Sequence, residues 1–293
     1  LEHSIWLNLM YERAKYIYKL MSDDGTLFVH IDDNEIAYLT VILDEIFGRE
    51  NRVSIVTFKQ GAVTGHKAIN PGLVTTTNFI LVYAKNKKSW VPNRLFTAKG
   101  RDSRYSQFIE NYEESYENWR YIPLSQAVGN ELGIQSRQLK KALGENYERE
   151  IESFVMRYPE RVIRTARPDY KSVGQNVRDA IDASKKDPEK VFLLKRENHS
   201  DMYFTNGERI LFYKDKLKEI DGMLVAGEPL SNLWDDLLSN NLHKEGGIKF
   251  PKGKKPEFLI KRVLELCTQE GDLVLDSFAG SGTTAAVAHK LNR

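Results

Sequence analysis

The 293-residue sequence predicts an α/β protein in which an α+β domain is inserted into a sheet domain. Near the start, helical and strand patterns alternate. Near the end, an apolar run leads through a Gly-rich turn into a small-residue helix. The stretch between them is rich in charged and aromatic residues, and its apolar runs are short and irregular. These observations predict a first part of the sheet domain over 1–86, an insert over 87–245 and a second part over 246–293.

The first part of the chain predicts the order helix, strand, helix. Apolar residues at helical spacing predict a helix over 5–21, which the turn at 22–25 closes. Residues 26–31 form a nearly continuous apolar run, which is typical of a strand buried on both faces in a parallel sheet. The acids at 32–35 predict the cap and first turn of a second helix, which ends before Gly48.

Further strands and helices are predicted on both sides of the insert. Residues 53–58 and 79–84 are rich in β-formers and could pair as a long hairpin. After the insert, Pro256 is placed to begin a helix. The apolar run Leu273–Phe278 predicts a strand, and a last helix is expected from Thr284.

Composition limits the class of protein. The chain is 41% hydrophobic and 29% charged, which is ordinary for a folded protein. A formal net charge of +2 neither requires nor excludes a nucleic-acid partner. The single cysteine, Cys267, lies in an apolar helical pattern, so we expect it in the core and the protein in a reducing compartment. No apolar run approaches the ~18 residues of a membrane helix. We expect a cytoplasmic protein with no membrane partner, and a chain that starts at Leu1 looks internal to a larger protein.

The Gly-rich turn is the strongest functional signal. Residues 280–285, Gly-Ser-Gly-Thr-Thr-Ala, fit the pattern G-x-G-x-x-G/A, which alone is a weak indication of dinucleotide binding. It is not a phosphate-binding Walker loop, because no lysine follows. Asp276 at the strand end and Phe278 before the glycines make the pattern more specific. Such a turn lets backbone N–H groups and a helix N-terminus hold an anionic group of a ligand.

The segment Asp276–Thr284 resembles the S-adenosylmethionine loop D-P-F-x-G-S-G-T-T of the β-class amino methyltransferases that act on DNA, with Ser277 where proline is usual. That family also has a Lys-Pro pair that opens a helix over the methionine end of the cofactor, and Lys255-Pro256 matches it. The segments 24–51 and 79–86 resemble the modification (Mod) subunits of Type III restriction–modification systems within the family. The resemblance covers roughly 6–86 and 250–293.

The resemblance implies a Rossmann-like S-adenosylmethionine-dependent methyltransferase sheet, partial here and with a circularly permuted motif order, whose insert is a target-recognition domain. It implies transfer of a methyl group from S-adenosyl-L-methionine to adenine N6 in double-stranded DNA. A homodimer and a restriction (Res) subunit are the implied protein partners. The residues that it assigns to the cofactor are Lys255, Pro256, Asp276, Phe278, Ala279, Gly280, Ser281, Gly282, Thr283 and Thr284.

The catalytic motif of the family is absent from these residues. It consists of Asp or Asn, two prolines and an aromatic residue, and it holds the target amine and stacks on the flipped base. In the β-class order it precedes the first helix, so we expect it upstream of Leu1, and we expect the acid that holds the cofactor ribose after Arg293. The family places the strand with this motif between the strands at 26–31 and 273–278. We therefore expect the 293 residues alone to be unstable or inactive.

Basic residues interleaved with aromatic ones in the insert are candidates for DNA contacts. The alternative is that arginines at spacings of three and four form an ordinary solvated helix face, and the sequence leaves both open. The candidates are Arg101, Arg104, Arg157, Arg161, Arg164, Arg167 and Lys171.

Other interpretations stay open. Cytosine N4 methylation uses similar motifs, and a catalytically dead DNA-binding remnant would keep the insert without the chemistry. A nucleotide-dependent oxidoreductase would need an acid about 20 residues beyond the Gly-rich turn. His30 fits a strand end better than a base. The acids Asp32, Asp33 and Glu35 fit helix capping better than metal binding, so we expect no metal site.

Overall fold

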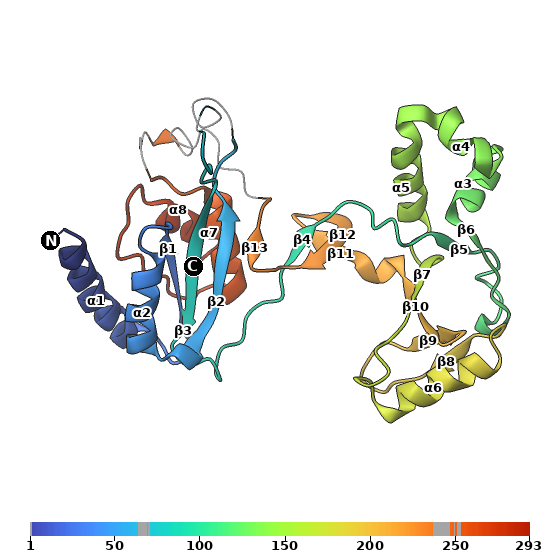
Figure 1. Cartoon of the computed structure of the whole chain (residues 1–293), viewed down its shortest axis with the longest axis horizontal. Helices are drawn as coiled ribbons and strands as arrows, with labels where there is room; N and C mark the ends of the chain where they lie inside the picture. Colours follow the sequence, from blue (N-terminus) through green and yellow to red (C-terminus); the bar gives the residue numbers. More distant parts are fainter. Residues whose placement is uncertain (1, 64–68, 70, 237–246, 249, 251–252) are drawn as a thin grey trace. The chain divides into compact units, whose positions relative to one another are not determined.

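The computed structural model describes residues 2–63, 69, 71–236, 247–248, 250 and 253–293. It is a mixed α/β structure that divides into two compact units (Figure 1). The terminal unit consists of 1–95 and 229–293, and the middle unit of 96–228. The middle unit lies within the range 87–245 of the predicted insert, whereas the predicted boundary at 245–246 falls outside the described residues.

The terminal unit contains both ends of the chain and one sheet. Its elements are α1 (Glu2–Leu20), β1 (Thr26–Ile31), α2 (Ile36–Phe47), the 3-10 turn η1 (Arg49–Asn51), β2 (Arg52–Lys59), β3 (Thr77–Ala84), β13 (Leu233–Trp234), α7 (Glu257–Cys267) and α8 (Thr283–Lys290).

The sheet of the terminal unit has the strand order β1-β3-β2-β13. β3 pairs antiparallel with β1, where Phe28 lies opposite Val82, and with β2, where Val56 lies opposite Ile80. The predicted hairpin of β2 and β3 is therefore confirmed. The prediction that 26–31 is a strand buried on both faces in a parallel sheet is wrong for the part of the sheet that the structure describes. β1 is antiparallel to β3, and all six of its residues are only half-buried, since an apolar run reports neither the direction nor the number of its neighbours. Among the described strands of this sheet, β13 runs parallel to its neighbour, β2.

Side chains of β3 alternate between two cores, as the two-residue period of a strand requires. Leu81 and Tyr83 pack with α1 and α2 on one face of the sheet. Ile80 and Val82 pack with Trp234 of β13 and with α7 on the other face. Figure 1 shows this layering, with α1 and α2 on one side of the strands and α7 on the other.

The second helix, α2, starts without the acidic cap that the sequence predicted. Glu35 occupies the N-cap position but makes no side-chain capping hydrogen bond, and the first turn contains no acid. Asp32 instead accepts hydrogen bonds from the backbone N–H of Asn34 (3.2 Å) and from its side chain (3.1 Å). The capping prediction is therefore wrong, because Asp32 forms a local turn that uses its oxygens before the helix begins. The predicted end is confirmed, since Gly48 follows α2 with φ of 86°.

The last part of the chain forms two helices and lacks the predicted strand. Pro256 is the N-cap of α7, as predicted, and α8 begins at Thr283. The segment Leu273–Phe278 lies outside any strand, and Leu273 is fully exposed. The strand prediction is therefore wrong here. A strand requires a hydrogen-bonded neighbour, and none of the described strands pairs with this segment.

The middle unit contains two sheets and four helices within its described range. Its elements are β4 (Phe96–Ala98), β5 (Gln107–Ile109), η3 (Tyr116–Asn118), β6 (Tyr121–Pro123), α3 (Leu124–Leu132), α4 (Ser136–Leu143), η4 (Gly144–Asn146), α5 (Tyr147–Arg157), β7 (Val162–Ala166), α6 (Gln175–Lys186), β8 (Phe192–Leu194), β9 (Met202–Thr205), β10 (Glu208–Phe212), η5 (Tyr213–Lys216), β11 (Leu217–Ile220) and β12 (Met223–Pro229).

The larger sheet of the middle unit has the order β6-β5-β7-β10-β9-β8, and the smaller one the order β11-β12-β4. On one face of the larger sheet, Phe108 and Val162 pack against α3, α4 and α5. On the other face, Ile109 and Ile163 pack against aromatic side chains, among them Trp119. The middle unit therefore has a helical face and an aromatic face.

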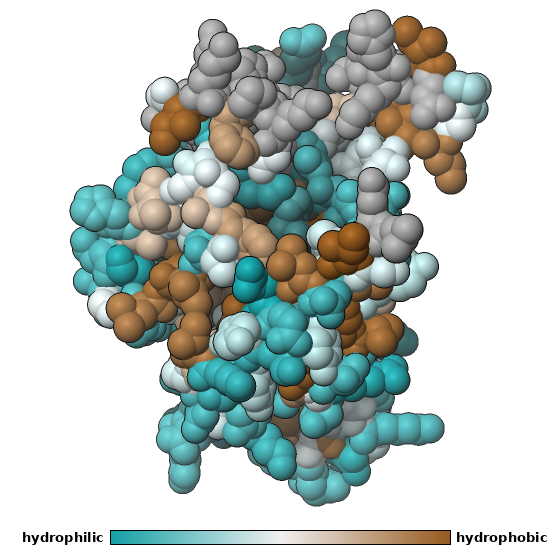
Figure 2. Space-filling view, turned by 90° about the vertical axis from the view of Figure 1, so that its left-hand side faces the viewer, coloured by the Kyte–Doolittle hydropathy of each residue, from teal (hydrophilic) through white to brown (hydrophobic). Residues whose placement is uncertain are grey.

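Apolar side chains reach the surface of the terminal unit. Ile5 and Leu9 of α1 and Val41 of α2 are exposed. Figure 2 looks at the side of the molecule where α1 lies, and brown apolar side chains appear there between polar ones. None of the described helices is long and apolar enough to cross a membrane.

We predict that Trp234 anchors the return of the chain to the terminal unit. It is 1% exposed, packs between β2, β3 and α7, and donates from Nε1 to the carbonyl of Ser231 at 2.7 Å. Trp234→Ala should lower the free energy of unfolding by about 3–5 kcal/mol, because a large cavity forms in this core. Leu233→Ala, on the same strand but exposed, should cost much less. Chemical denaturation compares the two variants, and equal losses would contradict this role.

Candidate functional site

The Gly-rich turn before α8 is built by two glycines in left-handed conformations. Gly280 has φ of 51° and Gly282 has φ of 74°, and both values favour glycine over residues with a Cβ. The N–H of Gly282 donates to the carbonyl of Ala279 at 2.7 Å, which closes the turn. The hydroxyls of Ser281 and Thr283 are hydrogen-bonded to each other at 2.9 Å. These contacts hold the turn in one shape at the start of α8.

The N-terminus of α8 is not capped by a side chain. Gly282 is the N-cap and provides no side-chain acceptor, and the first intrahelical bond runs from the N–H of Ala286 to the carbonyl of Gly282 at 3.0 Å. The N–H groups of Thr283, Thr284 and Ala285 therefore precede the first helical acceptor. Together with the helix dipole, they form a place where an anionic group is favourable.

Asp276 is fixed beside this turn. Its Oδ1 accepts a hydrogen bond from the N–H of Phe278 at 3.0 Å, so the carboxylate is oriented by the backbone two residues ahead. Both residues are exposed, as are Ala279 and Gly280. The loop thus presents a carboxylate and a set of backbone donors on one accessible segment.

Lys255 and Pro256 lie at the start of α7, away from direct bonds to the turn. None of the hydrogen bonds or ion pairs among the described residues joins either of them to 276–284. The link runs through the packing of α7 on α8, where Leu264 contacts the cluster of Val287, and through an ion pair between Lys290 and Glu257. The structure therefore brings the loop residues together, and places Lys255 and Pro256 at the other end of the same helix pair.

The surroundings of Lys255 were missed by the sequence analysis. Burial lowers the pKa of Lys255, and the charge of Asp32 opposes this shift. Burial, together with the charge of Lys255, lowers the pKa of His30 to about 3, while Asp32 again opposes the shift. The two strand-end residues and the lysine therefore share one electrostatic environment.

His30 is held as a neutral ring on the α7 face of the sheet. It lies two residues from Phe28, whose side chain packs with the α7 core. The side-chain amide of Asn78 lies 3.1 Å from Nε2 of His30, and the ring of Phe58 lies 5.1 Å from the imidazole. In the sequence, the alternation of side chains along a strand was the only indication that His30 shares a face with Phe28. The apolar residues on both sides of His30 hid this alternation.

The other candidate residues of the terminal unit have structural roles. Burial raises the pKa of the Cys267 thiol to about 12, and its Sγ–H donates to the carbonyl of Val263 at 3.2 Å. Cys267 is nevertheless only partly buried, so the predicted core position is confirmed in part. Among the described residues, no group of three His, Cys, Asp or Glu side chains is arranged to hold a metal ion.

Most of the predicted DNA-contacting cations of the middle unit have partners inside the protein. Four of them are paired with carboxylates. These pairs are Arg101 with Glu148 at 3.2 Å, Arg104 with Asp102 at 2.7 Å, Arg167 with Glu208 at 3.0 Å, and Arg157 with Glu131. DNA contact by these residues would have to compete with an existing ion pair.

The remaining three cations have no carboxylate partner among the described residues. Arg161 donates to the carbonyls of Ile109 (3.1 Å) and Glu110 (2.5 Å). Arg164 lies over the ring of Tyr105 at 5.3 Å, and Lys171 is exposed.

The alternative of one helix carrying these arginines is wrong. Arg157 ends α5, Arg161 lies in the following turn and Arg164 lies in β7. Spacings of three and four residues fit both a helix and a turn that leads into a strand, so spacing alone did not separate the two.

We predict that His30 makes stability depend on pH. Its folded pKa of about 3 lies below the ordinary histidine pKa of 6.5, so between these values the unfolded chain binds more protons than the folded protein. Stability should rise as pH increases through this window, by roughly 5 kcal/mol at most, and be fully present above it. Denaturation curves at about pH 4 and pH 6 should show this slope for the protein and a flatter one for His30→Gln. Equal slopes would rule the role out.

Comparison with known proteins identifies the family. The model of the family described as DNA methylase (N6_N4_Mtase) matches residues 1–293. The chain is 32% identical to the probable type III restriction-modification enzyme HindVI Mod subunit of Haemophilus influenzae, over 99% of this chain and 41% of that protein. It is 28% identical to the StyLTI Mod subunit of Salmonella typhimurium, over 99% of this chain and 39% of that protein. It is 23% identical to the Type II methyltransferase M.EcaI of Enterobacter cloacae, over 100% of this chain and 54% of that protein. The chain thus spans about two fifths of the length of the two Mod subunits, and it belongs to the DNA methylase family.

Proposed function

We propose that this chain is the cofactor-binding and DNA-recognising part of an S-adenosylmethionine-dependent DNA methyltransferase that methylates adenine N6. The observation that carries the proposal is the turn Gly280–Thr284, whose two left-handed glycines present the uncapped start of α8 next to Asp276. Family membership supports methyl transfer as the chemistry.

The residues of this loop fit the cofactor. S-adenosylmethionine carries a carboxylate and an ammonium group at its methionine end. The free N–H groups at the start of α8 suit the carboxylate, and the carboxylate of Asp276 suits the ammonium. Gly280 and Gly282 lack a Cβ, so a ligand can approach the backbone closely.

The residues of this chain would bind the cofactor and orient it. Thr283 and Thr284 contribute N–H groups to the loop, and Asp276 orients the methionine end. The resemblance also assigns Lys255 to the cofactor, although Lys255 lies at the other end of the α7–α8 pair from this loop. When bound, S-adenosylmethionine supplies an electrophilic methyl group. The loop residues act by positioning it, not by acid–base chemistry, in agreement with the neutral state of His30.

The group that holds the target amine would come from outside these residues. The 293 residues contain no Asp/Asn-Pro-Pro-aromatic motif, and we propose that its strand fits beside β1. Two observations support this position. β1 pairs with β3 alone among the described strands, and its six residues are only half-buried. Leu273 and Leu275 are exposed apolar side chains on the segment that should flank the strand from the other side.

The choice of adenine as the base rests on the resemblance to Type III Mod subunits, and the names of the relatives suggest the partners. Both relatives named above as Mod subunits belong, by their names, to Type III restriction-modification enzymes. We therefore propose double-stranded DNA as substrate, a restriction (Res) subunit as partner and a homodimeric assembly. Cytosine N4 is the alternative target, since the family model covers both.

We assign target recognition to the middle unit. The cofactor loop 276–284 belongs to the terminal unit, which leaves the middle unit for the recognition of the DNA target. Of the seven cations predicted to contact DNA, Arg164 and Lys171 are the best placed, because no described carboxylate pairs with them. Arg161 also lacks a described carboxylate partner, but it already donates to the carbonyls of Ile109 and Glu110. The Rossmann-like relation of the terminal unit to other methyltransferases, with permuted motif order, is part of the same proposal.

We predict that Asp276 controls cofactor affinity. Asp276→Ala in the complete protein should weaken S-adenosylmethionine binding by about tenfold or more, because a hydrogen-bonded charge is lost. DNA binding should remain. Isothermal titration calorimetry with the cofactor measures the change. Glu270→Ala, an exposed acid that precedes the same segment, is the matched control and should bind normally. Equal cofactor affinity in both variants would show that the loop does not contact the cofactor. If the complete protein bound DNA but no cofactor, a catalytically dead DNA-binding remnant would be favoured.

We also predict that the isolated 293 residues transfer no methyl group. The half-exposed β1 leaves backbone groups without partners, each of which costs about 1–3 kcal/mol if it is buried unsatisfied. Incubation with radiolabelled S-adenosylmethionine and DNA tests this, with the complete protein as the positive control. Turnover by the isolated stretch would disprove it.

A further inference from the structure

The first helix of the terminal unit carries apolar side chains on two opposite faces. On its inner face, residues of α1 such as Trp6 pack with α2 and the sheet. A surface helix normally has one apolar stripe and one polar face. The outer face of α1 nevertheless has a second stripe, which has no apolar partner among the described residues. Its four side chains have exposed fractions of 44–72%, and they are Ile5, Leu9, Tyr16 and Leu20.

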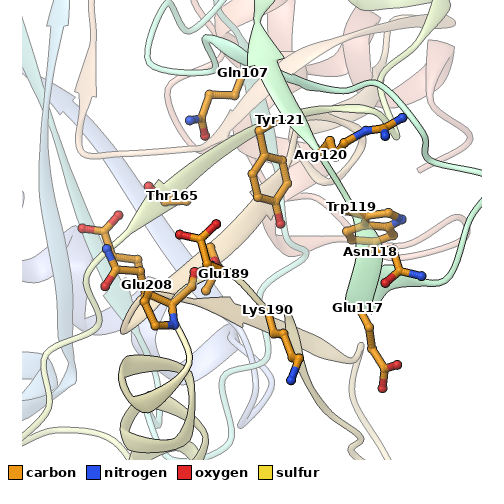
Figure 3. Close-up of a pocket in the computed structure, with 13 residues that line it drawn as sticks. Gln107, Glu117, Asn118, Trp119, Arg120, Tyr121, Thr165, Glu189, Lys190 and Glu208 are labelled. Atoms are coloured by element: carbon orange, nitrogen blue, oxygen red, sulfur yellow. Dashed lines mark hydrogen bonds between the residues drawn. The ribbon is translucent and has the colours of Figure 1, made fainter.

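This outer stripe differs in kind from the described pocket of the middle unit. That pocket has a volume of about 670 Å³ and a largely polar lining, with Gln107, Arg120 and Lys190 among the side chains that Figure 3 shows around it. The outer stripe is instead a row of apolar side chains along a helix. Such a row suits packing by another helix, because the side-chain ridges of one helix fit the grooves of another.

The outer stripe has the same spacing in both directions along the helix. Ile5 and Leu20 are equally distant from a point between residues 12 and 13, and so are Leu9 and Tyr16. An interface between two identical chains related by a two-fold axis requires a surface that matches itself after a half-turn. The outer stripe meets this condition for two antiparallel copies of α1, with the axis at that point.

The charges beside the outer stripe are compatible with such a pair. By the helical period, Glu12 and Lys15 lie on one flank of the stripe. They form an ion pair at 3.6 Å, so their charges balance close to the axis. Arg13 lies on the other flank. A long arginine side chain can cover apolar surface with its stem and keep its guanidinium in water.

Two exposed apolar side chains of α2 extend this surface. The rings of Tyr38 and His3 are 4.5 Å apart, which places Tyr38 beside the start of α1. Val41 follows one turn later on α2, and both Tyr38 and Val41 are more than half exposed. Their area matters because a helix of 19 residues is only about 28 Å long. Stable interfaces bury about 1,200–2,000 Å² in total.

We propose that two copies of this chain meet at the outer stripe of α1, as antiparallel helices related by a two-fold axis between residues 12 and 13. Leu9 then contacts Tyr16 of the second copy, and Ile5 contacts Leu20 of the second copy. The inference rests on the homodimer of the proposed function and deepens it, because it assigns a surface and a register to that dimer.

Disulfide formation in the complete protein tests the register. Leu9→Cys/Tyr16→Cys should form a covalent dimer on mild oxidation, seen on a non-reducing gel, because the two positions face each other across the axis. Within one helix they lie about 10 Å apart, whereas a disulfide needs Cα atoms about 4.4–6.8 Å apart. Neither Leu9→Cys nor Tyr16→Cys alone should give the covalent dimer. The unchanged protein, oxidised in parallel, accounts for cross-links through its own cysteines.

Charged residues on the outer stripe should separate the two copies. Leu9→Glu/Tyr16→Glu should raise the dissociation constant of the dimer about a hundredfold or more, which sedimentation measures. Both side chains are exposed, so the fold should be unchanged, and circular dichroism checks this. Leu73→Glu is the matched control, because Leu73 is an exposed leucine of the terminal unit outside α1. This control should remain dimeric.

These measurements need neither cofactor nor DNA, so they separate the dimer surface from methyl transfer. A cross-linked dimer that methylates no DNA would support the surface and contradict only the proposed function. A monomeric unchanged protein, or a covalent dimer of either single cysteine variant, would overturn the proposal. A dimer that neither forms the disulfide nor dissociates in the double glutamate variant would also overturn it, and would show that another part of the complete protein covers the outer stripe.

Discussion

The buried strand β3 must find a hydrogen-bonded neighbour on each edge, and the terminal unit is organised around that requirement. Its last five residues are buried, so unpaired backbone groups there would be costly. β1 satisfies one edge and β2 the other, although β1 precedes β2 in the chain. This arrangement also sets the positions of side chains. Because side chains alternate along β1 and β3, His30 and Asn78 lie together on the face where α7 packs, in the electrostatic environment of Lys255.

The same requirement explains what the terminal unit leaves open. β1 has a described partner on one edge only, and the segment 273–278 has none, so it does not form a strand. Leu273, Leu275 and Phe278 of this segment stay exposed, and Asp276 lies on the same accessible segment. We propose that a strand from elsewhere in the protein would pair with β1 on one side and with this segment on the other. The cofactor loop and the base-holding motif would then become neighbours through backbone pairing, as parts of one sheet.

Much of this was readable from the sequence, and the failures have physical causes. Features that depend on residues close together in the sequence were predicted correctly. These are the bounds of 26–31, the hairpin of β2 and β3, the start of α7 at Pro256 and the glycine turn. The direction of β1 and the absence of a strand at 273–278 depend on neighbours distant in the chain, which no local pattern reports.

Side-chain environments were harder to predict than elements. Asp32 uses its oxygens in a turn and does not cap α2, and most of the arginines of the middle unit are occupied by carboxylates or carbonyls. The charge pattern gave no means to distinguish a free arginine from a paired one.

The most direct test of the central claim is the identity of the base that the complete protein modifies. DNA is incubated with the protein and S-adenosylmethionine, digested to nucleosides and separated by liquid chromatography with mass detection. Our account predicts N6-methyl-2′-deoxyadenosine as the product, and less of it at a limiting cofactor concentration when Asp276 is replaced by alanine. N4-methylcytosine would contradict the assignment of adenine. No methylated base at all would contradict the account of this chain as part of a working methyltransferase.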